Sequence, residues 1–406
     1  MKTQVAIVGG GPGGAATAMF LQQAGVQSVV VEKDPFPRFH IGESMTGECG
    51  KIVRDLGFEE EMLQRRHPVK QGVNVYGPGG KNTFWVPVMR REDDGELIAT
   101  TTWQVRRSEF DQMLLDGAKE RGIPVLQGQA LEPIYDEDRT VRGVRVKLND
   151  GEIKEIECDV LVDASGPSTF LNKAGLTSKK ERGNYDNQVA VFSHVKGALR
   201  DEVDNTLIFY RQKNHWGWFI PLDDDVVSIG IVAPSEYFAE KQESKQDYFL
   251  REIQELNPQL TKRVKDVTLA EDVRAVSNYS YEIKDFTGKG YLCIGDSHRF
   301  VDPIFSFGLH FAVSEARLAS CAIATYLSGE SEDQENPFAA FQETSTYGQD
   351  AIQSLVDCFW QHPFAFAVFA HSRYKEDVID LFAGRIYADK PSRGLIAMRN
   401  MVNSSR

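Results

Sequence analysis

A glycine-rich turn between two apolar runs constrains the fold of this chain more than any other feature. The run Val5–Val8 leads into Gly9, Gly11 and Gly14 with the spacing G-x-G-x-x-G, and a second apolar run ends at Glu32. Continuous apolar character indicates strands buried on both faces, as in parallel sheets with helical crossovers. The order strand, turn, helix, strand therefore predicts a dinucleotide-binding βαβ unit.

Each part of this pattern has a physical reason. The first glycine makes the tight turn, the second lets the backbone approach a pyrophosphate, and the third lets helix and strand pack closely. The helix N-terminus offers N–H groups and a positive dipole to the phosphates. Glu32 lies where an acidic residue accepts hydrogen bonds from a ribose. A glycine-rich turn without a ligand is the alternative, and the agreement of all the parts favours the dinucleotide.

Charge and composition exclude several classes of protein. The 406 residues carry 59 acidic and 46 basic side chains, a net charge of -13, so the average field repels nucleic acid and anionic membrane surfaces. We expect neither as a partner. Apolar runs fall short of the roughly 18 residues that span a bilayer, the start of the chain lacks a signal-peptide pattern, and the five cysteines are scattered. These features favour a cytoplasmic protein, and the histidine spacing indicates no metal site.

Three further motifs favour FAD over NAD as the dinucleotide. Gly295-Asp296 follows an apolar run and resembles the second flavin signature of glutathione-reductase-like flavoproteins, which implies that Asp296 binds the ribityl chain. Arg107, in the pattern V-x-R-x-x-F-D, and the run Asp163–Gly166 resemble motifs of flavin monooxygenase relatives. Each also fits a helix cap, but their order along the chain favours FAD.

The remaining patterns predict an α/β protein: a glutathione-reductase-like FAD-binding Rossmann domain with an inserted, mostly antiparallel β-sheet substrate domain and a helical C-terminal tail. Helices are expected over Ser108–Gly122 and Phe311–Leu327, and a hairpin around Asn149-Asp150-Gly151. The predicted division is an FAD-binding domain over 1–80, 100–183 and 285–330, a substrate domain over 81–99 and 184–284, and a helical region over 331–406.

The stretch HWGWFIPL is the most specific one in the chain. As a strand it sends Trp216, Trp218 and Ile220 to one face and Pro221 to the other, so the two indoles form an apolar wall. A core strand with large aromatics is the alternative reading. The string W-x-W-x-I-P, however, closely resembles the signature of flavin-dependent halogenases.

The resemblance to flavin-dependent halogenases extends along the first three quarters of the chain. Arg38 with Gly42-Glu43-Ser44 resembles their R-x-x-x-G-E-S element, and the segment 302–308, DPIFSFG, resembles their D-P-V-F-S-S-G. Lys70 stands where these enzymes carry an essential lysine, although by itself it also fits a solvated surface residue. The short tail is similar to halogenases of phenol and pyrrole substrates rather than to the longer tryptophan halogenases.

The resemblance implies a reaction of FADH2, dioxygen and chloride or bromide that forms hypohalous acid, which halogenates an electron-rich aromatic ring. It implies that Lys70 carries or orients the electrophilic halogen, and that Trp216 and Trp218 separate substrate from flavin. The implied partners are an aromatic substrate, in some relatives tethered to an acyl or peptidyl carrier protein, and a flavin reductase. The implied cofactor-binding residues are Gly9, Gly11, Gly14, Glu32, Arg38, Ser44, Arg107 and Asp296, and the implied substrate and halide residues are Ile220, Pro221, Pro303, Phe307 and Gly308.

One departure from the halogenase pattern leaves alternatives open. Phe307 replaces the second serine of the halide segment, beside the backbone N–H of Gly308. A related FAD-dependent monooxygenase, or a reductase of polyprenyl double bonds like geranylgeranyl reductase, shares the fold and the Gly-Asp and G-E-S elements. A catalytically silent flavoprotein that binds a biosynthetic partner is a third reading. The W-x-W-x-I-P string and Lys70 favour the halogenase.

Overall fold

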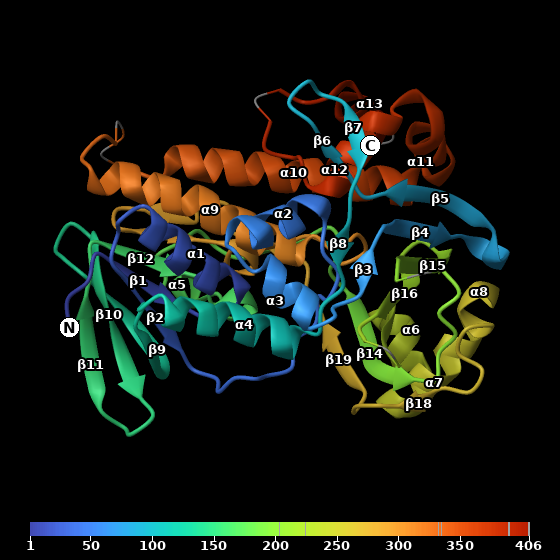
Figure 1. The fold of residues 1–406 in the computed structure, drawn as a ribbon, viewed down its shortest axis with the longest axis horizontal. Coiled ribbons are helices and arrows are strands. Elements are labelled where there is room, and N and C mark those ends of the chain that lie inside the picture. Colours follow the sequence, from blue (N-terminus) through green and yellow to red (C-terminus); the bar gives the residue numbers. More distant parts are fainter. Residues whose placement is uncertain (203, 224, 332, 334, 389, 405–406) are drawn as a thin grey trace.

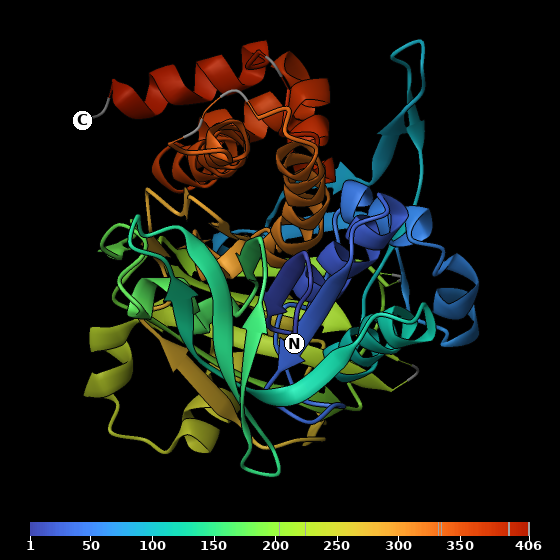
Figure 2. The same cartoon turned by 90° about the vertical axis from the view of Figure 1, so that its left-hand side faces the viewer.

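The computed structural model describes residues 1–202, 204–223, 225–331, 333, 335–388 and 390–404. Two large sheets lie side by side, and helices from the C-terminal third cover one side of both (Figure 1). Turned by 90°, the chain shows these helices stacked above the N-terminal domain (Figure 2). This arrangement has the predicted fold class: an α/β nucleotide-binding domain, a second β-rich domain and a helical C-terminal region.

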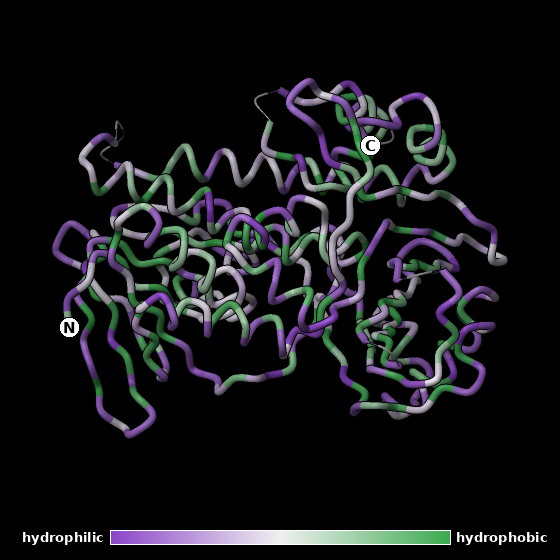
Figure 3. The backbone as a smooth tube through the Cα atoms, viewed as in Figure 1, coloured by the Kyte–Doolittle hydropathy of each residue, from purple (hydrophilic) through white to green (hydrophobic). Residues whose placement is uncertain are grey.

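The first sheet has five central parallel strands in the order β9-β2-β1-β12-β22. The residues of β1, β2 and β12 are buried on both faces, as the continuous runs predicted. The predicted hairpin is confirmed, since β10 and β11 pair across the turn at Gly151, and its tip is hydrophilic (Figure 3). The strands are β1 (Val5–Val8), β2 (Ser28–Glu32), β9 (Val125–Tyr135), β10 (Val141–Leu148), β11 (Ile153–Glu157), β12 (Val160–Asp163), β21 (Thr287–Gly288) and β22 (Tyr291–Cys293).

Helices on both sides complete this domain. The apolar faces of α1, α4 and α9 pack in the same core as β1, β2 and β12. Both predicted long helices exist, although the first begins one residue earlier than expected and the second three residues earlier. The helices are α1 (Pro12–Gln23), α2 (Gly47–Asp55), α3 (Glu59–Gln64), α4 (Arg107–Glu120), α5 (Phe170–Lys173) and α9 (Gly308–Leu327).

The second sheet runs in the order β18-β14-β17-β16-β15-β4-β5, and β19 also pairs with β14. All of these pairs are antiparallel except β15 with β4, so the sheet is mostly antiparallel as predicted. The strands are β4 (Gly72–Tyr76), β5 (Asn82–Pro87), β14 (Gln188–Lys196), β15 (Thr206–Gln212), β16 (His215–Pro221), β17 (Val226–Pro234), β18 (Thr268–Leu269) and β19 (Arg274–Ser277).

Each face of the second sheet has its own helical cover. One face packs against α7 (Lys245–Glu255), and the opposite face packs against the C-terminal helices. The cover elements are α6 (Ser235–Glu240), α8 (Pro258–Thr261), α10 (Ala339–Gln361), α11 (Pro363–Val368), a π-helix (Phe369–Arg373), α12 (Lys375–Ala383) and α13 (Arg393–Asn403). Short strands form further small sheets: β3 (Val69–Lys70) pairs with β8 (Thr102–Trp103), and β13 (Glu181–Arg182), β20 (Tyr281–Glu282) and β23 (Arg299–Phe300) form a three-stranded sheet. In the described part of the chain, no helix is long and apolar enough to cross a membrane.

The strand pairing differs from the expected domain boundaries at two points. The predicted FAD-binding segment 1–80 includes β4, which pairs with β15 inside the second sheet. The predicted substrate-domain segment 81–99 is divided: β5 lies in the second sheet, whereas β6 (Met89–Arg91) and β7 (Leu97–Ala99) form a separate hairpin. Parallel pairing joins segments that are far apart in sequence, so the place of β4 in the second sheet has no local signal that would reveal it.

A buried ion pair on the α7 side of the second sheet predicts how the fold responds to acid. Burial raises the pKa of Glu252, but hydrogen bonds from His215, Tyr237 and Arg251 outweigh burial and lower the pKa to about 2. This stabilisation is present above the ordinary pKa of 4.5 and is lost as the pH falls from 4.5 toward 2. We therefore expect Glu252→Gln to remove on the order of 3 kcal/mol of stability at neutral pH.

Urea unfolding of the two proteins between pH 2.5 and 7 measures this effect. The difference in unfolding free energy should shrink as the pH falls. A difference that stays constant across this range would contradict the assignment.

Candidate active site

A cavity of about 1410 Å³ is lined by residues of both sheets and of α9. It exceeds the roughly 300–1,000 Å³ of ordinary small-molecule pockets, so it has room for a dinucleotide together with a second ligand. Most of the predicted site residues line it: Gly9, Gly11, Glu32, Arg38, Ser44, Arg107, Trp218, Ile220, Asp296, Pro303, Phe307 and Gly308. The remaining ones, Gly14, Lys70, Trp216 and Pro221, lie outside that lining.

The glycine turn has the geometry that its sequence predicts. Gly9 has a φ of +108°, and a Cβ on Gly14 would lie 1.9 Å from the carbonyl oxygen of Gly9, so Gly14 allows α1 to pack against the turn. Gly11 differs, because its Cβ would meet Arg38 Nη2 at 3.5 Å and otherwise face the cavity. Glu32 is buried and accepts hydrogen bonds from the backbone N–H groups of Gly10 and Asp34, which fix its carboxylate at the cavity wall.

Two arginines bring positive charge to the nucleotide end of the cavity. Arg107 forms a two-bonded pair with Asp111 and donates to the carbonyl oxygens of Ile41 and Gly42, so it holds the loop before Ser44. Arg38 also lines the cavity, and its buried Nε has no hydrogen-bond partner among the described residues. A buried donor without a partner and the bare backbone of Gly11 both fit an anionic pyrophosphate.

A glutamate of α9, Glu315, fixes the backbone of the Gly295-Asp296 turn. The backbone N–H of Gly295 donates to Glu315 Oε2 at 2.6 Å, and Glu315 also bonds His298, Ser345 and Gln349. Burial raises the pKa of Asp296 to about 7, against the lowering effect of Arg107. Asp163 of the earlier motif instead caps its own turn, accepting from the N–H groups of Ser165 and Leu171. The turn therefore presents Asp296 to the cavity, where a ribityl hydroxyl would bond it.

Lys70 is a buried ammonium and not a surface residue. It is 3% exposed, and its Nζ donates to Ser44 Oγ and to the carbonyl oxygen of Met45, both at 2.9 Å. Burial lowers its pKa to about 7, while the nearby Cys49 thiol acts in the opposite direction. Ser44 Oγ lies 2.7 Å from the Thr206 hydroxyl, and both residues line the cavity. Lys70 thus reaches the cavity edge through Ser44.

The tryptophan strand has the predicted orientation. Trp216, Trp218 and Ile220 point to the core shared with the C-terminal helices, and Phe219 points to the opposite core. The two indoles are neighbours, with ring centroids 5.9 Å apart. Trp218 lines the cavity, and its Nε1 donates to Ser228 Oγ at 3.1 Å, which fixes the ring plane. Trp216 is buried beside Trp218, outside the cavity lining.

The segment before α9 gives the cavity an apolar wall and a helix N-terminus. Phe307 is 2% exposed, and its ring lies near His310 and Phe311, with centroids 5.9 Å away in both cases. Gly308 starts the 20-residue helix α9, and a Cβ placed on it would meet nothing within 4 Å. The N-terminus of a long helix thus lies at the cavity wall, and its positive end suits a small anion.

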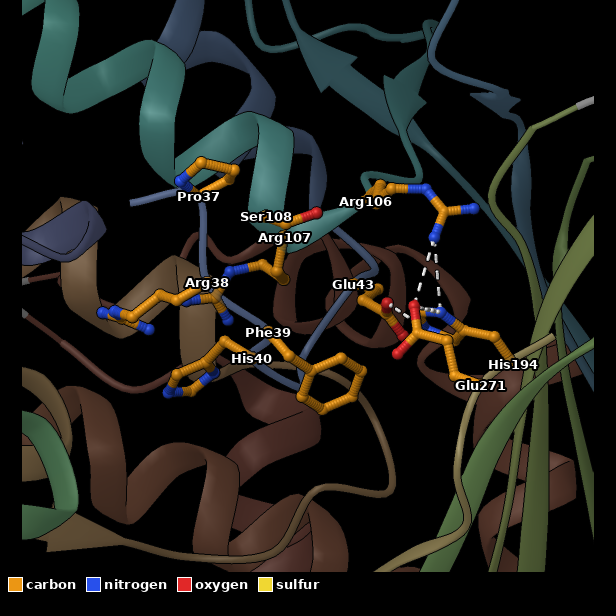
Figure 4. Close-up of a pocket in the computed structure, with 10 residues that line it drawn as sticks. All are labelled: Pro37, Arg38, Phe39, His40, Glu43, Arg106, Arg107, Ser108, His194 and Glu271. Carbon is orange, nitrogen blue, oxygen red and sulfur yellow. Dashed lines mark hydrogen bonds and ion pairs between the residues drawn. The ribbon is translucent and has the colours of Figure 1, made fainter. Parts of the chain in front are cut away.

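Sequence reasoning missed a polar cluster beside this cavity (Figure 4). His194 of β14 lies between Glu43 and Glu271, with Nε2 2.8 Å from Glu43 Oε1 and Nδ1 3.0 Å from Glu271 Oε1. A small pocket of about 150 Å³ adjoins all three side chains. Sequence reasoning also missed Thr206, whose hydroxyl bonds Ser44, and Gln104, whose Nε2 donates to Thr206. The G-E-S element was the available signal for Glu43, while the other residues belong to no motif.

Comparison with known proteins identifies the family. A profile described as the FAD binding domain matches residues 2–336. A brominase of 1H-pyrrole-2-carbonyl-peptidyl-carrier protein from Pseudoalteromonas luteoviolacea is 38% identical over 94% of this chain and 91% of its own length. The solved structure of the flavin-dependent brominase Bmp2 superposes with a TM-score of 0.92 at 35% identity, covering 100% of this chain and 99% of that one. The chain therefore belongs to the FAD-binding flavin-dependent halogenases.

The lengths of the relatives agree with the predicted type. A chlorinase of 1H-pyrrole-2-carbonyl-peptidyl-carrier protein from Pseudomonas fluorescens is 28% identical, with 98% of this chain and 92% of the relative covered. A tryptophan 2-halogenase from Chondromyces crocatus is 32% identical, but the match covers 62% of it. FAD as the cofactor and the phenol- or pyrrole-type halogenase family are thus confirmed, and the monooxygenase and reductase alternatives are not favoured.

Replacement of two glycines should separate FAD binding from folding. Gly11→Val places a branched side chain where the backbone faces the cavity, so we expect loss of FAD binding with an unchanged melting temperature. Gly14→Ala, the matched control, forces a Cβ against the Gly9 carbonyl and should lower the melting temperature of the FAD-free protein. Flavin titration and thermal unfolding measure the two effects. Parental FAD affinity in Gly11→Val would place the site elsewhere.

Proposed function

We propose that this enzyme halogenates an electron-rich pyrrole or phenol ring carried on a peptidyl or acyl carrier protein, with reduced flavin supplied by a separate reductase. The similarity to two carrier-protein halogenases over more than nine tenths of the chain supports the substrate class. The buried, hydrogen-bonded Lys70 beside the cavity is the structural observation on which the chemistry rests. Bound FAD, when reduced, supplies the electrons that activate dioxygen. We also expect the enzyme to act in the cytoplasm.

In this proposal Lys70 orients hypohalous acid for attack by the aromatic ring. Its two acceptors are neutral oxygens, so they position the nitrogen without cancelling its charge. Near pH 7 the lowered pKa lets the amine exist both with and without its extra proton. The protonated form donates a hydrogen bond to an oxygen or halogen, and the neutral form can accept the halogen directly. A surface lysine with an ordinary pKa would be almost fully protonated at the same pH.

The walls of the cavity keep the reactive species apart in this proposal. Trp218, backed by Trp216, forms the apolar side between flavin and substrate, and Ile220 and Pro221 continue the strand. Pro303, Phe307 and Gly308 form the halide end, where the α9 N-terminus attracts an anion through backbone N–H groups. Because backbone donors survive a side-chain change, phenylalanine at 307 is compatible with halide binding. It makes this end more apolar, which suits an aromatic ring.

Substitution of Lys70 tests its role. Lys70→Ala should leave FAD binding and oxygen-driven flavin reoxidation nearly unchanged, while halogenated product falls by at least 100-fold. Lys70→Arg should fail as well, because a guanidinium stays protonated and cannot offer a nucleophilic amine. Product mass spectrometry beside flavin reoxidation rates measures both. The control is Lys51→Ala, since the exposed Lys51 on α2 bonds Asp55 and should be dispensable. Parental product yield from Lys70→Ala would refute the assignment.

The carrier requirement has its own test. With FAD, NADH, a flavin reductase, oxygen and bromide, pyrrole-2-carboxylate loaded on a carrier protein should be halogenated at least tenfold faster than the free acid. Omission of the reductase should stop turnover, since the sequence has one glycine fingerprint and no second nucleotide fold. Equal rates for free and carrier-bound acid would contradict tethering. Rapid anaerobic bleaching of the flavin by NADH alone would contradict the need for a reductase.

A further inference from the structure

The chemistry proposed above consumes a proton at the buried end of the cavity, near Ser44 and Lys70. Reduced flavin, dioxygen, halide and one proton give oxidised flavin, hypohalous acid and water, which balances atoms, electrons and charge. Two electrons from the flavin reduce one oxygen atom of dioxygen to water. Two electrons from the halide reduce the other oxygen atom, which stays bonded to the halogen in hypohalous acid. The single proton must come from solvent, although the residues around Ser44, Lys70 and Asp296 are largely buried.

The Glu43–His194–Glu271 cluster spans the distance from solvent to the cavity (Figure 4). The Glu271 side chain is 31% exposed, whereas the His194 and Glu43 side chains are 3% and 1% exposed. One imidazole nitrogen faces each carboxylate, at 3.0 Å from Glu271 and 2.8 Å from Glu43. Glu43 lines both the small pocket and the large FAD cavity. An exposed acid is therefore connected to a cavity-lining acid through one imidazole.

Glu43 has the spare capacity that a proton donor needs. Its Oε1 bonds His194, and its Oε2 is buried without a hydrogen-bond partner among the described residues. A buried carboxylate oxygen without a donor is costly for a residue whose role is structural. The same oxygen is free to carry a proton toward a ligand.

We propose that Glu271, His194 and Glu43 form a proton relay that delivers the solvent proton consumed in hypohalous acid formation. The N–H bond at His194 Nε2 breaks as an O–H bond forms at Glu43, and Glu43 passes this proton into the cavity. A solvent proton that arrives through Glu271 and water in the small pocket binds Nδ1 as the Nε2 proton leaves, and rotation of the neutral imidazole ring then returns an N–H group to face Glu43 before the next turnover. The small pocket's volume of about 150 Å³ holds several water molecules. His194 and Glu271 act through Glu43, so they position and recharge it. This relay rests on the proposed function.

The surrounding charges are balanced so that His194 can hold a proton. Burial lowers the pKa of His194, but the hydrogen bond and charge of Glu43 and the charge of Glu271 raise it above 6.5 overall. Arg106 opposes this, with Nη1 3.4 Å from His194 Nδ1, and Asp223 pairs with Arg106 at 2.6 Å. The other charged or titratable groups that line the small pocket are Arg38, His40 and Arg107. Arg274, outside that lining, bonds Glu271.

Nuclear magnetic resonance of the FAD-free protein tests the relay independently of turnover. With ¹⁵N-labelled histidine, His194 should titrate above the ordinary value of 6.5, and Glu271→Gln should lower that titration midpoint by removing one of its two carboxylates. A parental midpoint below 6.5, or no change in Glu271→Gln, would overturn the relay. These outcomes do not depend on whether the enzyme halogenates a carrier-bound pyrrole.

Chemical rescue separates proton transfer from a structural role. His194→Ala leaves space beside the small pocket, so added imidazole should restore halogenation that has fallen at least tenfold, and FAD affinity should stay parental. The matched control is His215→Ala, which removes an equally buried histidine–glutamate pair from the other face of the same sheet and should show no rescue. Glu271→Gln, which keeps the side-chain size, should narrow the pH range of product formation at its alkaline end.

Two results would overturn the relay. One is parental halogenation by His194→Ala between pH 6 and 9. The other is a loss of activity that imidazole does not restore while FAD binding stays intact. Should His194→Ala fail to fold, the Glu271→Gln pH profile and its resonance titration decide the matter.

Discussion

The burial of one ammonium group at the junction of two sheets is the constraint on which the rest of this structure depends. Lys70 ends β3, immediately before the chain enters the second sheet at β4, and its Nζ bonds Ser44 and Met45 of the loop before α2. Ser44 in turn bonds Thr206 at the start of β15. A buried cation is costly unless its hydrogen bonds are satisfied, so these contacts fix the nucleotide domain relative to the second sheet.

The need to hold Ser44 as an acceptor for Lys70 explains why the loop before Ser44 makes so many hydrogen bonds. Arg107 donates to the carbonyl oxygens of Ile41 and Gly42, Asp111 orients Arg107, and the carbonyl oxygen of Glu43 accepts from the N–H of Val105. The loop therefore brings three functions to one place: contact with the flavin cavity, the acceptor for Lys70, and the carboxylate of Glu43. A shift of this loop would disturb all three together, which is why single variants need both a flavin readout and a product readout.

The sequence predicts the parts of this site that local chemistry dictates. Gly9 and Gly14 are required by a turn that leaves no space for a Cβ, and Trp216, Trp218 and Ile220 follow from the period of a strand. The sequence does not predict contacts between residues that only the tertiary structure brings together. β4 joins β15 by parallel pairing, Thr206 meets Ser44 across the domain junction, and His194 meets Glu43 and Glu271 from separate elements. Nor does the sequence show that Lys70 is buried, since a single lysine in a short strand carries no burial signal.

Phe307, which stands where the halogenase pattern has a serine, changes the wall of the cavity at the start of α9. Phe307 and Gly308 both line the cavity, so the phenyl ring is part of the wall at this end. The phenyl ring also packs near His310 and Phe311, on the side toward the C-terminal helices. In the proposed function the change therefore alters the apolar surface that an aromatic substrate would meet, while the backbone N–H groups at the start of α9, which a side-chain change does not remove, would still attract an anion.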